Sequence, residues 1–229
     1  MEKKEILRRN LDRVIWNIEK ARISVSEHHI VKIVAVSKYT DEESIKILYE
    51  LGQRAFGENQ VQQLEKRVEA LEDLPIEWHM IGTLQRNKIN KLIKLRPSLV
   101  HSVDSLRLAK ALNDRLQEHN KRMNILLQIN SSKEKSKSGV SISEAFDIYL
   151  EILDKFPNLN LKGVMTIGAL SRDKEVVKRG FEETYRVFEH LKKYGARVCS
   201  MGMSSDYELA IRCGSNMVRI GSDIFKAEE

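Results

Sequence analysis

Short apolar runs alternate with longer amphipathic segments along most of this chain, after a leading stretch with a helical pattern. In that stretch apolar side chains recur every three or four positions, which predicts a helix with one packing face. The later apolar runs predict strands, and the segments between them predict helices. The leading stripe consists of Ile6, Leu7, Leu11, Val14, Ile15 and Ile18, and the predicted strands are residues 33–36, 55–56, 77–81, 99–103, 125–129, 161–167, 198–201 and 217–220.

About eight strands alternating with helices over 229 residues predict an α/β fold, a (β/α)8 barrel. We expect residues 1–229 to form a single domain, with a doubly wound open sheet as the alternative architecture. Only the residues DIFKAEE follow the last strand and the turn after it, too few for a full eighth helix. We therefore expect the N-terminal helix to cover that gap.

Composition narrows the classes of function without choosing one. The net charge is +6, from 39 Lys and Arg against 33 Asp and Glu, but the signs are mixed along helical faces. The densest basic segment, residues 131–139, holds no aromatic residue that could stack a base, so we expect no nucleic-acid partner. Without a signal peptide or an apolar span, we expect a cytoplasmic protein that does not bind membranes. Cys199 and Cys213 lack metal-ligand spacing, which favours free thiols and no metal site.

One lysine, Lys38, ends the run VKIVAVSK. Desolvation at the end of a buried strand favours the neutral amine, which can form a Schiff base with an aldehyde. A lysine in this place can instead extend its head into solvent and carry no chemistry. Two turns near the other end of the chain change that balance.

Those turns follow the last two predicted strands and resemble a phosphate cradle. Ser204 and Ser205 precede Asp206 and a helical pattern, whose first amides could face an anion. Gly221 and Ser222 offer a close backbone approach beside a hydroxyl. Each turn alone is also compatible with an ordinary helix cap or strand end. In a closed barrel, however, strands one and eight are neighbours, so both turns and Lys38 would meet at the same mouth.

Six motifs in order, from VSK and FGEN through WHMIGTLQRNK and KSG to SMGMSSD and VRIGSDIF, resemble the pyridoxal phosphate homeostasis proteins, also called the YggS or PROSC family. The resemblance implies a TIM barrel related to the N-terminal domain of alanine racemase. It also implies a binding protein for pyridoxal 5′-phosphate (PLP) that regulates supply of this vitamin B6 cofactor and can deliver it to apo-enzymes. We expect a monomer, with free amino acids as further ligands.

By motif position, the resemblance makes Lys38 the Schiff-base lysine and Arg219 the residue near the pyridine nitrogen. An arginine there would leave that nitrogen unprotonated and weaken the electron sink. Asn59 and His79 are expected to line the mouth, although Asn59 could equally cap a helix and Arg219 could pair with a carboxylate. The cofactor-binding residues are thus expected to be Lys38, Asn59, His79, Ser200, Met203, Ser204, Arg219, Gly221 and Ser222.

Two other functions remain compatible with these residues. One is a PLP-dependent enzyme acting on amino acids, such as a weak racemase, which would need an acid/base group on the face opposite the lysine. The other is a cofactor-free barrel whose lysine handles a phosphorylated carbonyl, as in an aldolase. We expect a carrier or regulator rather than an enzyme, and assign no catalytic residue.

Overall fold

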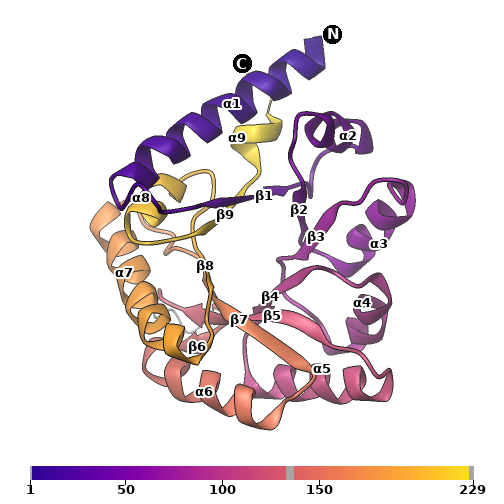
Figure 1. Ribbon diagram of the computed structural model, residues 1–229, viewed down its shortest axis with the longest axis vertical. Coiled ribbons are helices and arrows are strands. Elements are labelled where there is room, and N and C mark those ends of the chain that lie inside the picture. The colour runs from indigo at the N-terminus through magenta and orange to yellow at the C-terminus, as the bar shows by residue number, and fades with distance from the viewer. Residues whose placement is uncertain (1, 133–136, 227–229) are drawn as a thin grey trace.

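The computed structural model describes residues 2–132 and 137–226. Within these residues, eight parallel strands close into a barrel in the order β4-β3-β2-β1-β9-β8-β7-β5, with β5 pairing back to β4, and helices surround them (Figure 1). The barrel strands are β1 (Lys32–Val36), β2 (Ala55–Glu58), β3 (Glu77–Met80), β4 (Leu99–Val103), β5 (Met123–Asn130), β7 (Leu159–Thr166), β8 (Val198–Ser200) and β9 (Met217–Ile220). The closed barrel is therefore confirmed over the open sheet.

The predicted strands all exist, and their bounds differ from the prediction by at most two residues at either end. A further two-residue strand, β6 (Val140–Ser141), pairs with the end of β5 outside the ring and was not predicted. The helices are α1 (Glu2–Ile23), α2 (Glu42–Glu50), α3 (Val61–Ala70), α4 (Ile89–Leu95), α5 (Leu106–Glu118), α6 (Ile142–Lys155), α7 (Lys174–Leu191), α8 (Tyr207–Arg212) and α9 (Ser222–Phe225), with 3₁₀ turns at Arg86–Lys88 and Lys192–Tyr194.

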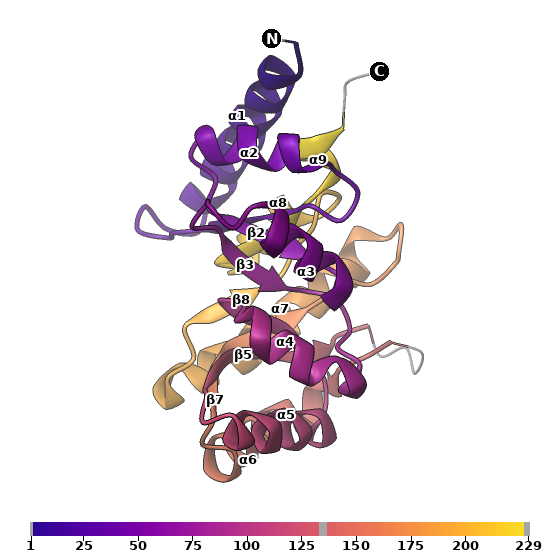
Figure 2. The same ribbon diagram turned by 90° about the vertical axis from the view of Figure 1, so that its right-hand side faces the viewer.

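The N-terminal helix α1 takes the place of a full eighth helix, as predicted. It packs beside α8, α9 and α2, and both views show it lying along this side of the barrel (Figures 1 and 2). The wholly buried Asn10 fixes it there, because its amide donates to the carbonyls of Ile224 at 3.1 Å and Lys226 at 2.8 Å. The prediction is wrong for one residue of the apolar stripe: Ile15 is 43% exposed, and Asn10 faces the core instead.

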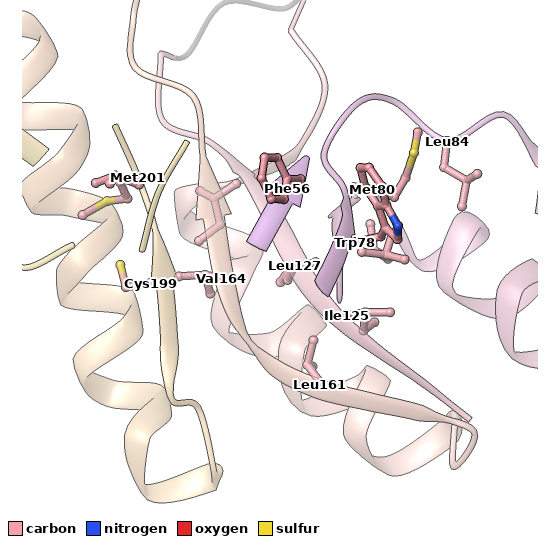
Figure 3. Close-up of a cluster of buried hydrophobic side chains, with 14 of the residues drawn as sticks. Phe56, Trp78, Met80, Leu84, Ile125, Leu127, Leu161, Val164, Cys199 and Met201 are labelled. Atoms are coloured by element: carbon pink, nitrogen blue, oxygen red, sulfur yellow. The ribbon is translucent and has the colours of Figure 1, made fainter. Parts of the chain in front are cut away.

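The main core lies between the strands and the surrounding helices. Outward-facing strand residues such as Phe56 and Trp78 fill it, with ring centroids 6.0 Å apart (Figure 3). Met80 is buried in the same cluster, so Trp78 and Met80 of the WHMIGTLQRNK motif supply core packing. Each large apolar side chain buried here contributes about 1.5–3 kcal/mol relative to exposure.

A smaller cluster fills the inside of the barrel. It takes one residue from each of six strands, namely Val34, Ala55, Leu99, Leu126, Met165 and Met217. This apolar plug fills part of the barrel interior. Polar side chains that point inward above or beside it must therefore bind to one another or to a ligand.

Both cysteines are free thiols, with Cys199 buried and Cys213 partly buried. Across the described part of the chain, none of the helices combines the length and the apolar character that crossing a membrane requires. Within the basic segment 131–139, residues 133–136 lie outside the described residues, and β6 follows the segment.

Candidate functional site at the barrel mouth

An open cavity of about 1190 Å³ lies at the carboxyl ends of the barrel strands. Seven of the nine predicted site residues line it, and they come from both ends of the chain. The two exceptions, His79 and Ser200, are buried beneath it. The seven are Lys38, Asn59, Met203, Ser204, Arg219, Gly221 and Ser222.

Strand pairing brings the two ends of the sequence together at this cavity. In the parallel register of β1 and β9, Ala35 lies opposite Ile220. Lys38 follows Ala35 by three residues and Gly221 follows Ile220 by one. A Cβ added to Gly221 would lie 3.3 Å from the carbonyl oxygen of Val36, so the two backbones approach closely at the mouth.

Lys38 is exposed, which differs from the expectation of a desolvated amine. The strand β1 ends at Val36, so the lysine extends from the loop and not from the buried strand. Its ammonium lies over the ring of Tyr39, with Nζ 4.9 Å from the ring centroid, and both residues line the cavity. The amine is therefore accessible to a ligand without any rearrangement of the core.

Buried polar groups hold the loop that carries Lys38. The hydroxyl of Ser37 donates to Glu58 Oε1 at 2.7 Å, and the guanidinium of Arg67 lies 3.6 Å from the same oxygen. Arg67 also donates to the carbonyl of Thr40 and to the carboxylate of Glu42. Burial raises the pKa of the wholly buried Glu58. Together these contacts fix both flanks of Lys38.

The hydroxyl of Ser204 joins the turn after β9 and not helix α8. Its Oγ accepts from the backbone N–H groups of Gly221 at 3.3 Å and Asp223 at 3.4 Å. The loop before α8 is instead closed by Asp206, whose carboxylate accepts from the backbone N–H of Met203 at 2.7 Å. Ser204 and Ser205 both line the cavity just before α8, and a contribution of their backbone amides to anion binding stays a prediction.

Asn59 lines the cavity and does not cap α3. The N-cap of that helix is Gln60, which makes no side-chain capping bond. The backbone of Asn59 is in close contact with Gly82, where an added Cβ would lie 2.0 Å from the Asn59 carbonyl oxygen. Only glycine fits at that position, which explains the glycine of the WHMIGT motif in physical terms.

Arg219 lies at the floor of the cavity, 4% exposed. Its Nη1 donates to the carbonyl of Ser200 at 3.0 Å and to the hydroxyl of Ser200 at 2.6 Å, and its Nη2 donates to the carbonyl of Thr166 at 2.9 Å. Burial lowers the pKa of this guanidinium to about 10, so it stays charged at neutral pH. In the described residues it makes no hydrogen bond to a carboxylate, the alternative that the sequence left open.

His79 lies one layer below the cavity, wholly buried, and so does not line the mouth as expected. Its Nε2 lies 3.0 Å from Glu77 Oε1, and its Nδ1 lies 2.9 Å from Nε2 of His101. Burial lowers the pKa of both imidazoles. Ser200, also wholly buried, connects this pair to Arg219 through its hydroxyl.

Two polar residues of the site were not found from the sequence. Gln128 lines the cavity from the end of β5, and His101 lies in the floor. Each interrupts an otherwise apolar strand, ILLQIN and LVHSV, at an inward position. Polar residues near the carboxyl end of a barrel strand were the available signal. Among the described residues, there is no group of three His, Cys, Asp or Glu side chains that could hold a metal ion.

Comparison with known proteins shows which family this chain is similar to. Residues 10–229 match the alanine racemase N-terminal domain family. The chain is 51% identical over 219 residues to a pyridoxal phosphate homeostasis protein of Helicobacter pylori, an alignment that covers 96% of this chain and 98% of the relative. The predicted kinship with the alanine racemase barrel is confirmed.

Two solved structures agree over nearly the whole chain. A protein from Bifidobacterium adolescentis described as unknown superposes with a TM-score of 0.90 at 31% identity, covering 98% of this chain and 96% of that one. PipY of Synechococcus elongatus, in a structure with PLP bound, superposes with a TM-score of 0.77 at 30% identity, covering 91% of this chain and 100% of that one.

Proposed function

This chain belongs to the pyridoxal phosphate homeostasis protein family, and from that premise we propose that it binds PLP in the cavity at the barrel mouth and takes part in intracellular supply of this cofactor. One observation carries the proposal: the pairing of β1 with β9 puts an accessible amine and a glycine-containing turn at the same cavity. The PLP bound in the related PipY structure supports it.

The residues present fit the chemistry of PLP. The cofactor supplies an aldehyde that a primary amine can hold covalently with loss of water, and a phosphate that needs hydrogen-bond donors. Lys38 would provide the amine. Ser204 and Gly221 would bind the phosphate at one edge of the cavity, because the Ser204 hydroxyl accepts from the N–H groups of Gly221 and Asp223 and keeps its own hydrogen to donate. Met203 and Ser222 complete that edge.

Arg219 would meet the pyridine ring from the floor. Three of its N–H bonds are used by Ser200 and Thr166, which leaves other N–H groups for a ligand. A guanidinium that keeps its proton can donate to the ring nitrogen but cannot transfer a proton to it. Asn59 would lie beside the ring. The site therefore binds the cofactor without promoting the carbanion chemistry of PLP enzymes.

Holding and releasing PLP is the role we infer from this design. The cavity is open, and Lys38 is exposed, so the cofactor could leave to apo-enzymes or to free amino acids that compete for its aldehyde. Transfer to a PLP-dependent apo-enzyme faster than spontaneous dissociation would support delivery. Equal rates would reduce the role to storage.

The deciding experiment traps the bound cofactor. The purified protein is incubated with PLP, reduced with borohydride and measured by intact mass and peptide mapping. We expect one adduct on Lys38, lost in Lys38→Ala and kept in Lys88→Ala and Lys226→Ala, which remove the other lysines that line the cavity. An adduct on one of those lysines, or none at all, would contradict the proposal.

A further inference from the structure

A chain of hydrogen bonds crosses the inside of the barrel and ends on Arg219. Nδ1 of His101, on β4, lies 3.1 Å from the hydroxyl of Ser200, on β8. Because β4 pairs with β3 and β5 while β8 pairs with β7 and β9, this bond cannot follow the sheet. It spans the barrel, and it joins the floor of the cavity to the opposite wall.

Below His101 the chain continues to the other face of the barrel. His101 contacts His79, and His79 contacts Glu77 at the start of β3. Glu77 accepts from Nζ of Lys32, at the start of β1, at 2.5 and 2.6 Å. The side chains of Glu77 and Lys32 are 34% and 43% exposed, so the chain begins at the solvent near the amino ends of the strands.

The donors in this chain have one consistent direction while both imidazoles are neutral, and the carboxylate of Glu77, which only accepts, sets it. At the other end Ser200 Oγ accepts from the guanidinium of Arg219, and its hydroxyl hydrogen is directed to His101 Nδ1. His101 must carry its proton on Nε2 and donate to His79 Nδ1. His79 in turn carries its proton on Nε2 and donates to Glu77. Both tautomers follow from the network.

That direction requires both imidazoles to be neutral, because a second proton on either ring would place two donors against each other. Burial independently favours the neutral form of each ring. The groups that face the pair are Glu77 and Lys32 on one side and Ser200 and Arg219 on the other. The interior thus links a carboxylate to a guanidinium through neutral groups, and the two charges do not pair directly.

From this arrangement we propose that His101, with His79 behind it, is a positioning residue for Arg219. The pair keeps the Ser200 hydroxyl turned away from the guanidinium, so that the oxygen lone pair accepts from Nη1 and the remaining N–H groups face the cavity. Under the proposed function, on which this inference rests, those N–H groups are the ones that meet the pyridine nitrogen of PLP. His101 acts through Ser200 and touches no ligand.

The test uses PLP labelled with ¹⁵N at the ring nitrogen and follows its NMR shift in the full-length protein. His101→Leu removes both contacts, whereas His101→Gln can still accept from Ser200 and donate to His79. We expect His101→Leu to shift or broaden the ¹⁵N signal and to weaken PLP binding about tenfold, the loss of one charge-assisted hydrogen bond. His101→Gln should restore much of both.

Two serine variants provide a second test that remains informative if the histidine variants do not fold. Ser200→Ala removes one hydroxyl from the chain, and Ser102→Ala removes an equally buried hydroxyl from β4 that has no hydrogen-bond partner among the described residues. We expect Ser200→Ala to move the ¹⁵N signal and Ser102→Ala to leave it unchanged. Identical signals and affinities in wild type, Ser200→Ala and His101→Leu would overturn the inference. Failure of wild type to form the Lys38 adduct would overturn the proposed function instead.

Discussion

Ala35 and Ile220 are partners in the parallel pairing of the first and last barrel strands. Lys38 follows Ala35 by three residues and Gly221 follows Ile220 by one, so the groups that we assign to the aldehyde and the phosphate of PLP come together here although most of the chain separates the two strands. Four measurements test how the surrounding structure holds the site in this form.

The turn after β8 depends on glycine at position 202. Gly202 has φ +97, and an added Cβ would lie 2.7 Å from the Cα of Tyr207, while its carbonyl accepts from the backbone N–H of Arg219 at 3.0 Å. Gly195→Ala is a matched control, since Gly195 has φ +93 but no atom within 4 Å of the added carbon. We expect Gly195→Ala to lower the free energy of unfolding by about 1–2 kcal/mol, and Gly202→Ala to lower it further and to weaken PLP binding. Denaturant titration measures both, and equal losses would show that the contact with Tyr207 has no energetic role.

The buried charges behind the Lys38 loop should respond unequally to substitution. Arg67→Met leaves Glu58 buried beside no cation, and we expect a loss of about 3–5 kcal/mol in the free energy of unfolding. Glu58→Gln keeps the contact with Ser37. It removes a carboxylate whose charged form burial already disfavours, since burial raises the pKa of Glu58, so we expect a much smaller loss in the free energy of unfolding. Chemical denaturation compares the two, and a Glu58→Gln loss as large as that of Arg67→Met would contradict this account.

Acid should destabilise the fold through the two buried histidines. Burial lowers the pKa of His79 and His101 in the folded state, while their unfolded value is 6.5. The unfolded chain therefore binds more protons below that value, and the free energy of unfolding falls as the pH drops through it, by up to about 1.4 kcal/mol per pH unit for each histidine. Glu77, whose pKa is lowered to about 2 chiefly by its hydrogen bond to His79, stays charged in this range.

The measurement is the free energy of unfolding between about pH 7 and pH 5, the range in which an unperturbed histidine titrates. His79→Gln should reduce the dependence of the free energy of unfolding on pH by the contribution of one histidine, up to about 1.4 kcal/mol per pH unit. Glu58 acts in the opposite sense between its raised folded pKa and its unfolded value of 4.5, and because it is present in both proteins its contribution cancels in the comparison of His79→Gln with wild type. A variant slope equal to that of wild type would show that His79 is not the group that titrates.

Amino acids should undergo no rapid proton exchange at this site. Racemisation needs an acid/base group opposite the lysine, and the described lining of the cavity contains one tyrosine, Tyr39, whose ring lies against Lys38 itself. We expect α-proton exchange in deuterated water to be no faster than with the same concentration of free PLP, and Tyr39→Phe to change nothing. Saturable exchange that disappears in Lys38→Ala would establish the enzyme alternative.

The sequence was sufficient for the barrel because the evidence for it is local. Apolar runs such as those around Val34 and Ile125 show strand character wherever they occur, and their alternation with helices restricts the topology. The end of β1 at Val36 was predicted correctly, but the exposure of Lys38 was not, because a loop after a strand has no periodic pattern that tells how its side chains lie. The two-residue strand β6 has too little pattern of its own to be detected.

The hydrogen bonds beneath the site could not have been predicted, because they form across the barrel. The bond between His101 and Ser200 joins residues that are distant in sequence and not neighbours in the sheet. The polar residues in LVHSV and VCSMG could mark the site, but neither motif shows which partner its side chain binds. Likewise, Ser204 was correctly associated with a turn, but only the folded structure shows that its partners are Gly221 and Asp223.

The meeting of β1 with β9 also has a consequence for folding. It is the seam at which the ring closes, and it requires the greatest loop-closure entropy of any strand pair in the barrel. A ligand bound to Lys38 after β1 and to Gly221 after β9 would connect the two strands that close the ring. Because such a ligand binds only the closed barrel, its binding would stabilise the folded state by mass action.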